Sequence, residues 1–298
     1  MRIASIDIGS NTVLLLIAEI VNSEIIPIVN EYRIPRISTG LANSGVISEE
    51  SIEKLYDILA DYQSIIKNQK CEKVIVNGTQ ALRVAKNSEI ILSEIKNRFG
   101  LELNIISGET EALYSFKGAI SSFTDGDNYS MIDIGGASTE IVLGNRDEIY
   151  FRKSFPIGVV TSKEKFLKTN PPTENEINNF RNELETIFDE LSKIDFENSA
   201  VISVAGTPTT LSALKQRLTD YSDSKIEKSI LTKTDLEYYV SEFKKRTYTE
   251  IETDYSPMVT GREDVILAGT LILDYLLEML KKDKLFVSGR GLRYGAIL

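Results

Sequence analysis

Two stretches of the chain repeat one pattern of apolar and polar positions. Residues 3–20 (IASIDIGSNTVLLLIAEI) and 130–145 (SMIDIGGASTEIVLGN) each hold an apolar run that ends in Asp, then Ile-Gly, small hydroxylated residues and a second apolar run. Apolar runs rich in β-branched residues favour strands, and the short glycine-containing segment between them favours a tight turn. The pattern therefore predicts two β-hairpins, and a single repeat at this spacing indicates two related domains rather than a repeat array.

The turns of these hairpins have a composition that suits phosphate. Glycine lets the backbone approach a ligand closely, and successive N–H groups in such a turn can hold phosphate oxygens. Asp7 and Asp133 precede the turns, where each can hold a cation or a metal-bound water, or can simply form the turn, as Asp often does at strand ends. Two such hairpins facing one another would form a phosphate clamp at a cleft between domains.

Helical and extended patterns alternate along the rest of the chain. Helices are predicted at 49–69 after the cap Ser48, around 81–99 before Gly100, at 107–120, after the capping pairs Thr173/Glu176 and Thr234/Glu237, and near 262–280. Strands are predicted at 73–79, 101–106 and 284–288. This order indicates α/β domains, and we place their junction in the polar segment 122–130.

The composition excludes several classes of enzyme. The 298 residues contain no histidine, which rules out Ser-His-Asp triads, Cys-His pairs and histidine-ligated zinc. General acid–base work then falls to carboxylates, Lys, Tyr or metal-bound water. The single Cys71 excludes an internal disulfide and fits a reducing compartment.

Charge and hydropathy predict a cytoplasmic protein that binds neither DNA nor membranes. The formal net charge is −10, and such a field repels polyanions. The apolar run 13–18 is far shorter than the roughly 20 residues that span a bilayer. Any anionic ligand must therefore be held by local groups.

Seven motifs, taken together and in order, resemble those of one known family. They are IDIGSNT (6–12), GTQALRVAKN (78–87), SGETEA (107–112), MIDIGGASTEIVLG (131–144), FPIG (155–158), AGTPTTL (205–211) and SGRGLRYG (288–295). The family is that of exopolyphosphatases and guanosine pentaphosphate phosphohydrolases (Ppx/GppA), within the actin/sugar-kinase/Hsp70 superfamily. The chain resembles a short form without the C-terminal helical domains of longer members.

The resemblance implies an α/β fold of two ribonuclease-H-like domains with an interdomain cleft. The first expected domain, 1–124, holds the first phosphate loop and the catalytic Glu. The second, 125–298, holds the second phosphate loop, and its last residues could pack back on the first domain. The implied activity is hydrolysis of a terminal phosphoanhydride with Mg²⁺.

Roles for individual residues are carried over from the matching motifs. Phosphate-binding residues would be Gly9, Ser10, Asn11, Arg83, Gly135, Gly136, Ser138, Thr139, Gly206 and Thr207. Glu111 matches the proposed general base, and Asp133 and Glu140 match acidic residues that hold Mg²⁺ or position water. With Asp7 added from the hairpin pattern, the expected metal residues are Asp7, Asp133 and Glu140.

Plainer interpretations stand beside several of these roles. Glu111 suits the start of a helix through the helix dipole alone. Glu140 could be a solvated strand position, Arg83 an exposed salt-bridged one, and Thr207 a helix N-cap followed by Pro208.

Two residues depart from the family pattern. Thr110 stands where the family usually has the first of two Glu residues, and the second is kept as Glu111. Tyr294 stands where the family tail usually has Glu, which puts any role of a tail carboxylate in doubt.

The expected reaction is release of inorganic phosphate from polyphosphate or from guanosine pentaphosphate. No basic cluster stands out, and long polyphosphate would need a basic track, so a short polyphosphate or a guanosine polyphosphate is favoured. Two rivals remain: an ATP-dependent kinase of the same superfamily, and a non-catalytic sensor that binds guanosine polyphosphates. A homodimer is left open.

Overall fold

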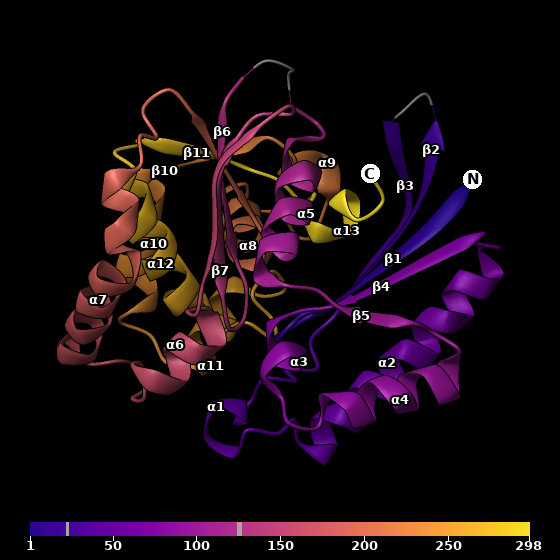
Figure 1. Ribbon diagram of the computed structural model, residues 1–298. Coiled ribbons are helices and arrows are strands. Elements are labelled where there is room, and N and C mark those ends of the chain that lie inside the picture. The colour runs from indigo at the N-terminus through magenta and orange to yellow at the C-terminus, as the bar shows by residue number, and fades with distance from the viewer. Residues whose placement is uncertain (22–23, 124–126) are drawn as a thin grey trace. The chain divides into compact units, whose positions relative to one another are not determined.

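The computed structural model describes residues 1–21, 24–123 and 127–298, which form two compact units (Figure 1). One unit comprises 1–118 with 292–298, and the other comprises 119–291. The boundary expected between residues 124 and 125 lies outside the described residues, so it stays a prediction.

The first unit is built on a five-stranded sheet in the order β3-β2-β1-β4-β5. Its strands are β1 (Arg2–Ile8), β2 (Val13–Val21), β3 (Glu24–Arg33), β4 (Lys73–Gly78) and β5 (Leu103–Ile105). Its helices are α1 (Leu41–Ser44), α2 (Glu49–Asn68), α3 (Gln80–Val84), α4 (Ser88–Phe99), α5 (Gly108–Ile120, which runs two residues into the second unit) and α13 (Leu292–Gly295). Strands β1, β2 and β3 are antiparallel neighbours, whereas β4 and β5 run parallel to β1.

The second unit has a six-stranded sheet in the order β10-β11-β9-β6-β7-β8. Its strands are β6 (Tyr129–Ile134), β7 (Thr139–Gly144), β8 (Ile149–Phe155), β9 (Ala200–Val204), β10 (Ser229–Thr232) and β11 (Lys284–Val287). Its helices are α6 (Val159–Lys165), α7 (Glu174–Phe188), the 3₁₀ helix η1 (Asp189–Lys193), α8 (Gly206–Lys215), α9 (Asp223–Ile226), α10 (Lys233–Phe243), α11 (Tyr248–Tyr255) and α12 (Ile266–Met279).

The two sheets repeat one topology. Strands β8-β7-β6-β9-β11 have the same order and directions as β3-β2-β1-β4-β5, and β10 is added antiparallel at the edge. In the ribonuclease-H-like arrangement, three antiparallel strands form a meander, and two further strands are added beside the first strand and run parallel to it. The α/β fold class is therefore confirmed in each unit.

The apolar core of the first unit lies on both faces of its sheet, because successive strand residues point to opposite faces. Ile6 and Ile8 of β1 pack with residues of α2 and α4 in one cluster, whereas Ile3 packs with Tyr294 and Ile297 at the C-terminus in another. Tyr294 is 3% exposed, so an aromatic ring in an apolar cluster occupies the position where the family usually has Glu.

One predicted helix is broken in two by a tertiary contact. The stretch expected to be helical around 81–99 forms α3 and α4, with Ala85 in an extended conformation between them. The Asn87 side chain bonds both the N–H and the carbonyl of Ile47, and the Lys86 N–H donates to the Gly45 carbonyl. These bonds to a distant loop replace helical bonds, which helix periodicity in the sequence cannot reveal.

The predicted caps are correct in some places and wrong in others. Ser48 caps α2, and Thr173 with Glu176 forms the capping box of α7. The box expected at Thr234 and Glu237 is wrong, because α10 is capped two residues earlier by Thr232 and Asp235. The last long helix, α12, begins at Ile266 rather than near residue 262.

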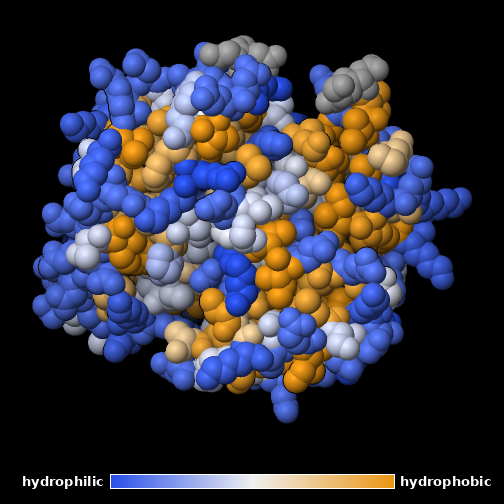
Figure 2. Space-filling model, in the orientation of Figure 1, coloured by the Kyte–Doolittle hydropathy of each residue, from blue (hydrophilic) through white to orange (hydrophobic). Residues whose placement is uncertain are grey.

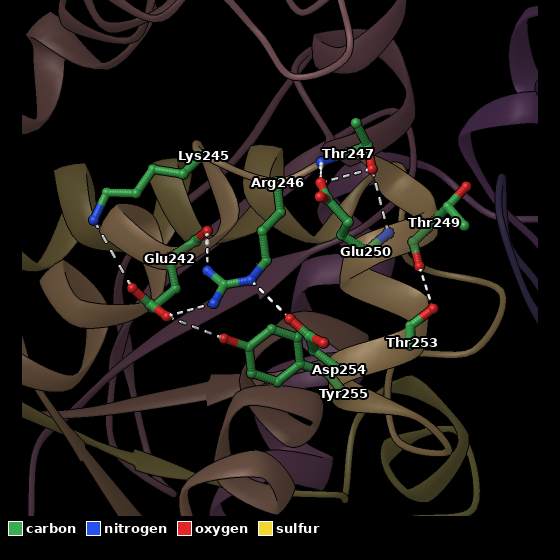
Figure 3. A network of polar contacts seen from close by, with 9 residues as sticks. All are labelled: Glu242, Lys245, Arg246, Thr247, Thr249, Glu250, Thr253, Asp254 and Tyr255. Atoms are coloured by element: carbon green, nitrogen blue, oxygen red, sulfur yellow. Dashed lines mark hydrogen bonds and ion pairs between the residues drawn. The ribbon is translucent and has the colours of Figure 1, made fainter.

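A polar network fixes the turn between α10 and α11 (Figure 3). The Arg246 guanidinium pairs with Glu242 through Nη2 and with Asp254 through Nε, each at 3.0 Å. Thr247 and Glu250 form the capping box of α11 in the same turn. Because one guanidinium joins carboxylates of both helices, it fixes the direction in which the chain leaves α10.

Polar residues cover much of the face shown in Figure 2, and apolar residues gather over the β2–β3 hairpin. The exposed apolar side chains there include Val21, Ile26, Ile28 and Tyr32. No helix among the described residues is long and apolar enough to cross a membrane.

We expect Gly295→Ala to destabilise the first unit strongly. A Cβ atom at Gly295 would lie 1.8 Å from the carbonyl oxygen of Tyr114, so the backbones of α13 and α5 would have to separate. Overpacking of this kind costs about 1–3 kcal/mol. Thermal unfolding measures the effect, with Gly291→Ala as control, because its nearest atoms lie 4.0 Å away. Equal melting temperatures for the two variants would contradict this packing.

Candidate functional site

The first hairpin turn is closed by its own backbone and held from one side. Gly9 N donates to Thr12 O at 2.9 Å. The carbonyl oxygens of the turn are bound by the segment after β3, because Ser38 N donates to Ser10 O at 3.0 Å and Arg36 N donates to Asn11 O at 3.1 Å. Arg36 and Ser38 were missed by the sequence analysis, and no local signal marks them.

The second hairpin turn has the same geometry. Gly135 N donates to Ser138 O at 2.9 Å, and the first N–H groups of α6, from Val159 and Val160, bind the carbonyls of Gly135 and Gly136 at 2.9 and 2.7 Å. Gly158 of the FPIG motif allows this close approach, because a Cβ atom at this position would lie 2.6 Å from backbone atoms of the turn.

The occupied carbonyls decide where the amide groups of both turns point. In a trans planar peptide the C=O of one residue and the N–H of the next point in opposite directions. The N–H groups of Asn11 and Thr12, and those of Gly136 and Ala137, therefore point away from the segments that bind the carbonyls. Adjacent N–H groups aimed to one side form an anion-binding concavity. The assignment of both turns as phosphate loops stays a prediction, and these N–H directions add Thr12 and Ala137 to its candidates.

Thr139 and Ser138 are buried in the second hairpin. The Thr139 hydroxyl donates to Ile157 O at 2.6 Å, so this side chain ties β7 to the FPIG segment. Ser138 and, in the first turn, Ser10 and Asn11 are each 5% exposed or less.

Two carboxylates lie side by side on the second sheet. Asp133 of β6 is the direct partner of Glu140 in the antiparallel ladder, so both side chains leave the same face. Glu140 is 1% exposed and accepts a 2.6 Å bond from the Ser154 hydroxyl of β8. The solvated-strand interpretation of Glu140 is therefore wrong, because this carboxylate is buried and held.

The corresponding place in the first unit has a different partner set. Asp7 faces Leu14 across the β1–β2 ladder, where Asp133 faces Glu140, and it faces Asn77 of β4 on its other side. Asn77 is 3% exposed, and its amide nitrogen has no hydrogen-bond partner among the described residues. Asn77 was also missed, because only the strand register shows that it adjoins Asp7.

Arg83 and Glu111 form an ion pair. Arg83 Nη1 lies 2.7 Å from Glu111 Oε2, although the two residues belong to α3 and α5. The guanidinium is held further by Gln80 Oε1 and by the carbonyl of Ile106. Their side chains are 17% and 11% exposed, so the interpretation of Arg83 as an exposed surface residue is wrong.

Glu111 lies in the first turn of α5, as the sequence predicted. Its N–H donates to Ser107 O, and the Ser107 hydroxyl accepts from Thr110 N at 3.1 Å. The Thr110 hydroxyl lies 3.0 Å from Ser107 Oγ, so Thr110 takes part in the turn that precedes Glu111.

The turn at 205–211 brings a cation to the start of α8. The helix begins at Gly206 after Ala205, which has φ 73°, so the interpretation of Thr207 as N-cap is wrong. Thr207 is buried against Gly269 of α12. A Cβ atom at Gly206 would lie 1.5 Å from Nη1 of Arg262, so glycine is required for this guanidinium to lie against the first turn of the helix.

The carboxylates of the second unit fit a magnesium ion. Among the described residues no group of three or more Asp, Glu, Cys or His could hold a metal by itself. Mg²⁺ commonly takes one or two carboxylates and completes its shell with water and substrate phosphate, which matches Asp133 and Glu140. Asp7 has no carboxylate opposite it on either neighbouring strand, so it is less suited than Asp133 and Glu140 to hold such an ion.

Comparison with known proteins decides the family. The model of the Ppx/GppA phosphatase family matches residues 16–298. The chain belongs to the Ppx/GppA phosphatase family.

Two curated relatives show how much of the family this chain spans. It is 31% identical to exopolyphosphatase 2 of Mycobacterium tuberculosis, over 100% of this chain and 98% of the relative. It is 34% identical to the bifunctional 3-dehydroquinate synthase/phosphatase of Fusobacterium nucleatum, but spans only 46% of that protein.

Solved structures of family members have the same fold. The Aquifex aeolicus member is 35% identical with a TM-score of 0.85, and covers 100% of this chain and 96% of its own. An exopolyphosphatase from Cytophaga hutchinsonii is 26% identical with a TM-score of 0.92, with the same coverage.

We expect Gly158→Ala to distort the second phosphate loop. The added Cβ atom would meet backbone atoms of Gly135, Gly136 and Ala137, which no side-chain rotation can relieve. Hydrogen exchange of the amides in 135–138 should become faster, while strands far from the loop stay protected. Gly289→Ala is the control, because its nearest atom, 3.3 Å away, is the end of the Tyr221 side chain. Unchanged exchange in 135–138 would show that Gly158 does not shape the loop.

Proposed function

We propose that this protein hydrolyses terminal phosphoanhydride bonds with Mg²⁺, releasing inorganic phosphate from polyphosphate or guanosine pentaphosphate. The observation that carries the proposal is the matched pair of hairpin turns, whose carbonyls are occupied and whose N–H groups point to one side. Family membership supports a hydrolase. Relatives named exopolyphosphatase 2 and guanosine-5'-triphosphate,3'-diphosphate pyrophosphatase (Photobacterium profundum, 27% identical) support these two substrates.

Glu111 is proposed to orient the attacking water and accept its proton. Arg83 Nη1 lies 2.7 Å from Glu111 Oε2, so the ion pair fixes the carboxylate in place. The described contacts occupy four of the five guanidinium N–H groups of Arg83, so one Nη2 hydrogen remains for a phosphate oxygen. Arg83 thereby serves first to position the base, and its phosphate contact is secondary.

Asp133 and Glu140 are proposed to hold Mg²⁺, with Asp7 contributing from the first hairpin. The ion would neutralise charge on the phosphate oxygens, which phosphoryl transfer requires along with positioning. Ser154 keeps the Glu140 carboxylate in place through its 2.6 Å bond.

The net charge bears on the choice of substrate. At −10, the protein repels a long polyanion unless several basic residues lie along its path. Among the described residues, Arg262 lies against Gly206 at the start of α8, and Arg83 is paired with Glu111. A short polyphosphate or a guanosine polyphosphate needs less neutralisation, and we favour these substrates. Cytoplasmic location and a homodimer stay predictions.

Phosphate release from polyphosphate and from guanosine pentaphosphate, measured side by side with Mg²⁺ and with EDTA, tests the proposal. Release that depends on Mg²⁺ is the expected result, and the ratio of rates identifies the substrate. ATP binding without phosphate release would favour the kinase. Tight binding of guanosine polyphosphate without turnover would favour the sensor.

Glu111→Gln should lower kcat by roughly 10²–10⁴ while substrate binding is largely retained, because the amide keeps the shape of the side chain but cannot accept the proton. Arg83→Lys should lower kcat as well, because a single ammonium cannot bond Gln80, Ile106 and Glu111 in one plane. Glu102→Gln, at an exposed pair with Lys96, is the control and should turn over normally. Near-normal kcat in Glu111→Gln would remove Glu111 from the chemistry.

A further inference from the structure

Two buried polar side chains flank Asp7 on the first sheet. Asn77 of β4 is its direct partner in the parallel β1–β4 ladder, and Ser5 precedes it by two residues on β1. Side chains alternate between the faces of a strand and paired residues share a face, so all three leave the same face of the sheet. Strand geometry spaces Ser5 and Asp7 by about 6.6 Å along β1, and separates neighbouring strands by about 4.8 Å.

The face on which these side chains lie is closed off from solvent. Leu16 and Ile75 are the partners of Ser5 in its two ladders. Both pack in the apolar cluster that contains Tyr294 near the C-terminus. Ser5 is 0% exposed and Asn77 is 3% exposed, so bulk water does not reach the hydroxyl of Ser5 and barely reaches the amide of Asn77.

Both buried side chains have a polar atom that the protein does not satisfy. Among the described residues, neither Ser5 Oγ nor Asn77 Nδ2 has a hydrogen-bond partner. Buried polar atoms are nearly always bonded to protein or to ordered water, because an unbonded one is costly. Two polar atoms about 5–6 Å apart can share one water molecule, which lies about 2.9 Å from each. The spacing of Ser5, Asp7 and Asn77 suits a shared water.

The second unit shows that the fold itself does not require polar residues at these two positions. Asp133 occupies the place of Asp7, with Met131 two residues before it and Val204 opposite it on β9. Met131 is 0% exposed and Val204 is 1% exposed, so the same topology packs well with apolar side chains there. Ser5 and Asn77 therefore need a reason other than packing, and both adjoin the carboxylate of Asp7.

Asp7 differs from its counterparts in how the sheet can hold it. In the second unit a hydroxyl of the neighbouring strand, from Ser154, binds Glu140. In the first unit the residue opposite Asp7 on β2 is Leu14, which offers no hydrogen bond from its side chain. A carboxylate has about four acceptor sites, so Asp7 can accept a bond from an enclosed water and still direct an oxygen toward a ligand.

We propose that Ser5, Asp7 and Asn77 enclose one ordered water molecule, through which Asn77 holds the Asp7 carboxylate in place. The water would donate to Asp7, accept from the Asn77 amide and form its third bond with the Ser5 hydroxyl, and three bonds are typical of a buried water. Asn77 is thus a positioning residue. The use of a fixed Asp7 toward Mg²⁺ rests on the proposed function, whereas the water site does not.

A double-mutant cycle tests whether Ser5 and Asn77 share a ligand. The variants are Ser5→Ala, Asn77→Val and the two combined, and valine is what the second unit carries at the place of Asn77. Each single change should lower the melting temperature by about 2–8 °C, because the water loses a partner. The combined fall should be smaller than the sum of the single falls, since the second change acts on a water already lost.

A crystal structure of the wild type observes the site without any substitution. Electron density for a water is expected within about 3.2 Å of both Asn77 Nδ2 and a carboxylate oxygen of Asp7.

The effect on Asp7 is measured by the Kd for Mg²⁺ from calorimetry. It should rise roughly tenfold in Asn77→Val, the lower end of the range for loss of a group that orients a metal ligand. Asn104→Val is the matched control, because Asn104 pairs with Asn77 on β5 in the same row of the sheet but is exposed. It should leave the Kd unchanged, and its effect on stability should add to that of Ser5→Ala.

The outcomes separate this proposal from the proposed function. Additive effects of Ser5→Ala and Asn77→Val, or a well-ordered crystal structure without the water, would refute the site and leave the hydrolase untouched. A coupled pair with an unchanged Kd for Mg²⁺ in Asn77→Val would refute the positioning of Asp7. Absence of phosphate release by the wild type would overturn the proposed function, while the cycle and the electron density would still decide the water site.

Discussion

The planarity of the peptide group is the constraint on which the candidate site depends. Each hairpin turn has its carbonyl oxygens bound from one side, by Arg36 and Ser38 in the first unit and by the start of α6 in the second. The following N–H groups must then point the other way. A turn of small residues thereby presents adjacent N–H groups to one side, which is the arrangement of known anion-binding turns. The sheets supply rigid hairpins on which these turns are held.

The acidic surface gives the remaining cations their importance. In a protein of net charge −10, Arg83 and Arg262 are each held by specific contacts. Arg83 is fixed by Glu111, Gln80 and a backbone carbonyl, and Arg262 lies against Gly206, where a larger residue would not fit. Both guanidinium groups are thereby held in defined positions.

The two units share a topology but differ at one decisive position. In the second unit, Glu140 lies opposite Asp133. In the first unit, the corresponding position opposite Asp7 is occupied by Leu14, which has no carboxylate. The second hairpin thus has two carboxylates side by side, whereas the first has one carboxylate beside the amide of Asn77. The same topology therefore carries different side chains at corresponding positions of the two units.

Local signals in the sequence determined the two hairpins, the fold class, the caps Ser48 and Thr173, and the place of Glu111 at the start of a helix. They could do so because strand alternation, glycine turns and helix capping depend on residues only a few positions apart. Tertiary structure alone decided the break before α4, the pairing of Arg83 with Glu111, and the positions of Ser38 and Asn77. Those contacts join segments far apart in the chain, and only the register of the sheet and the course of the loops bring them together.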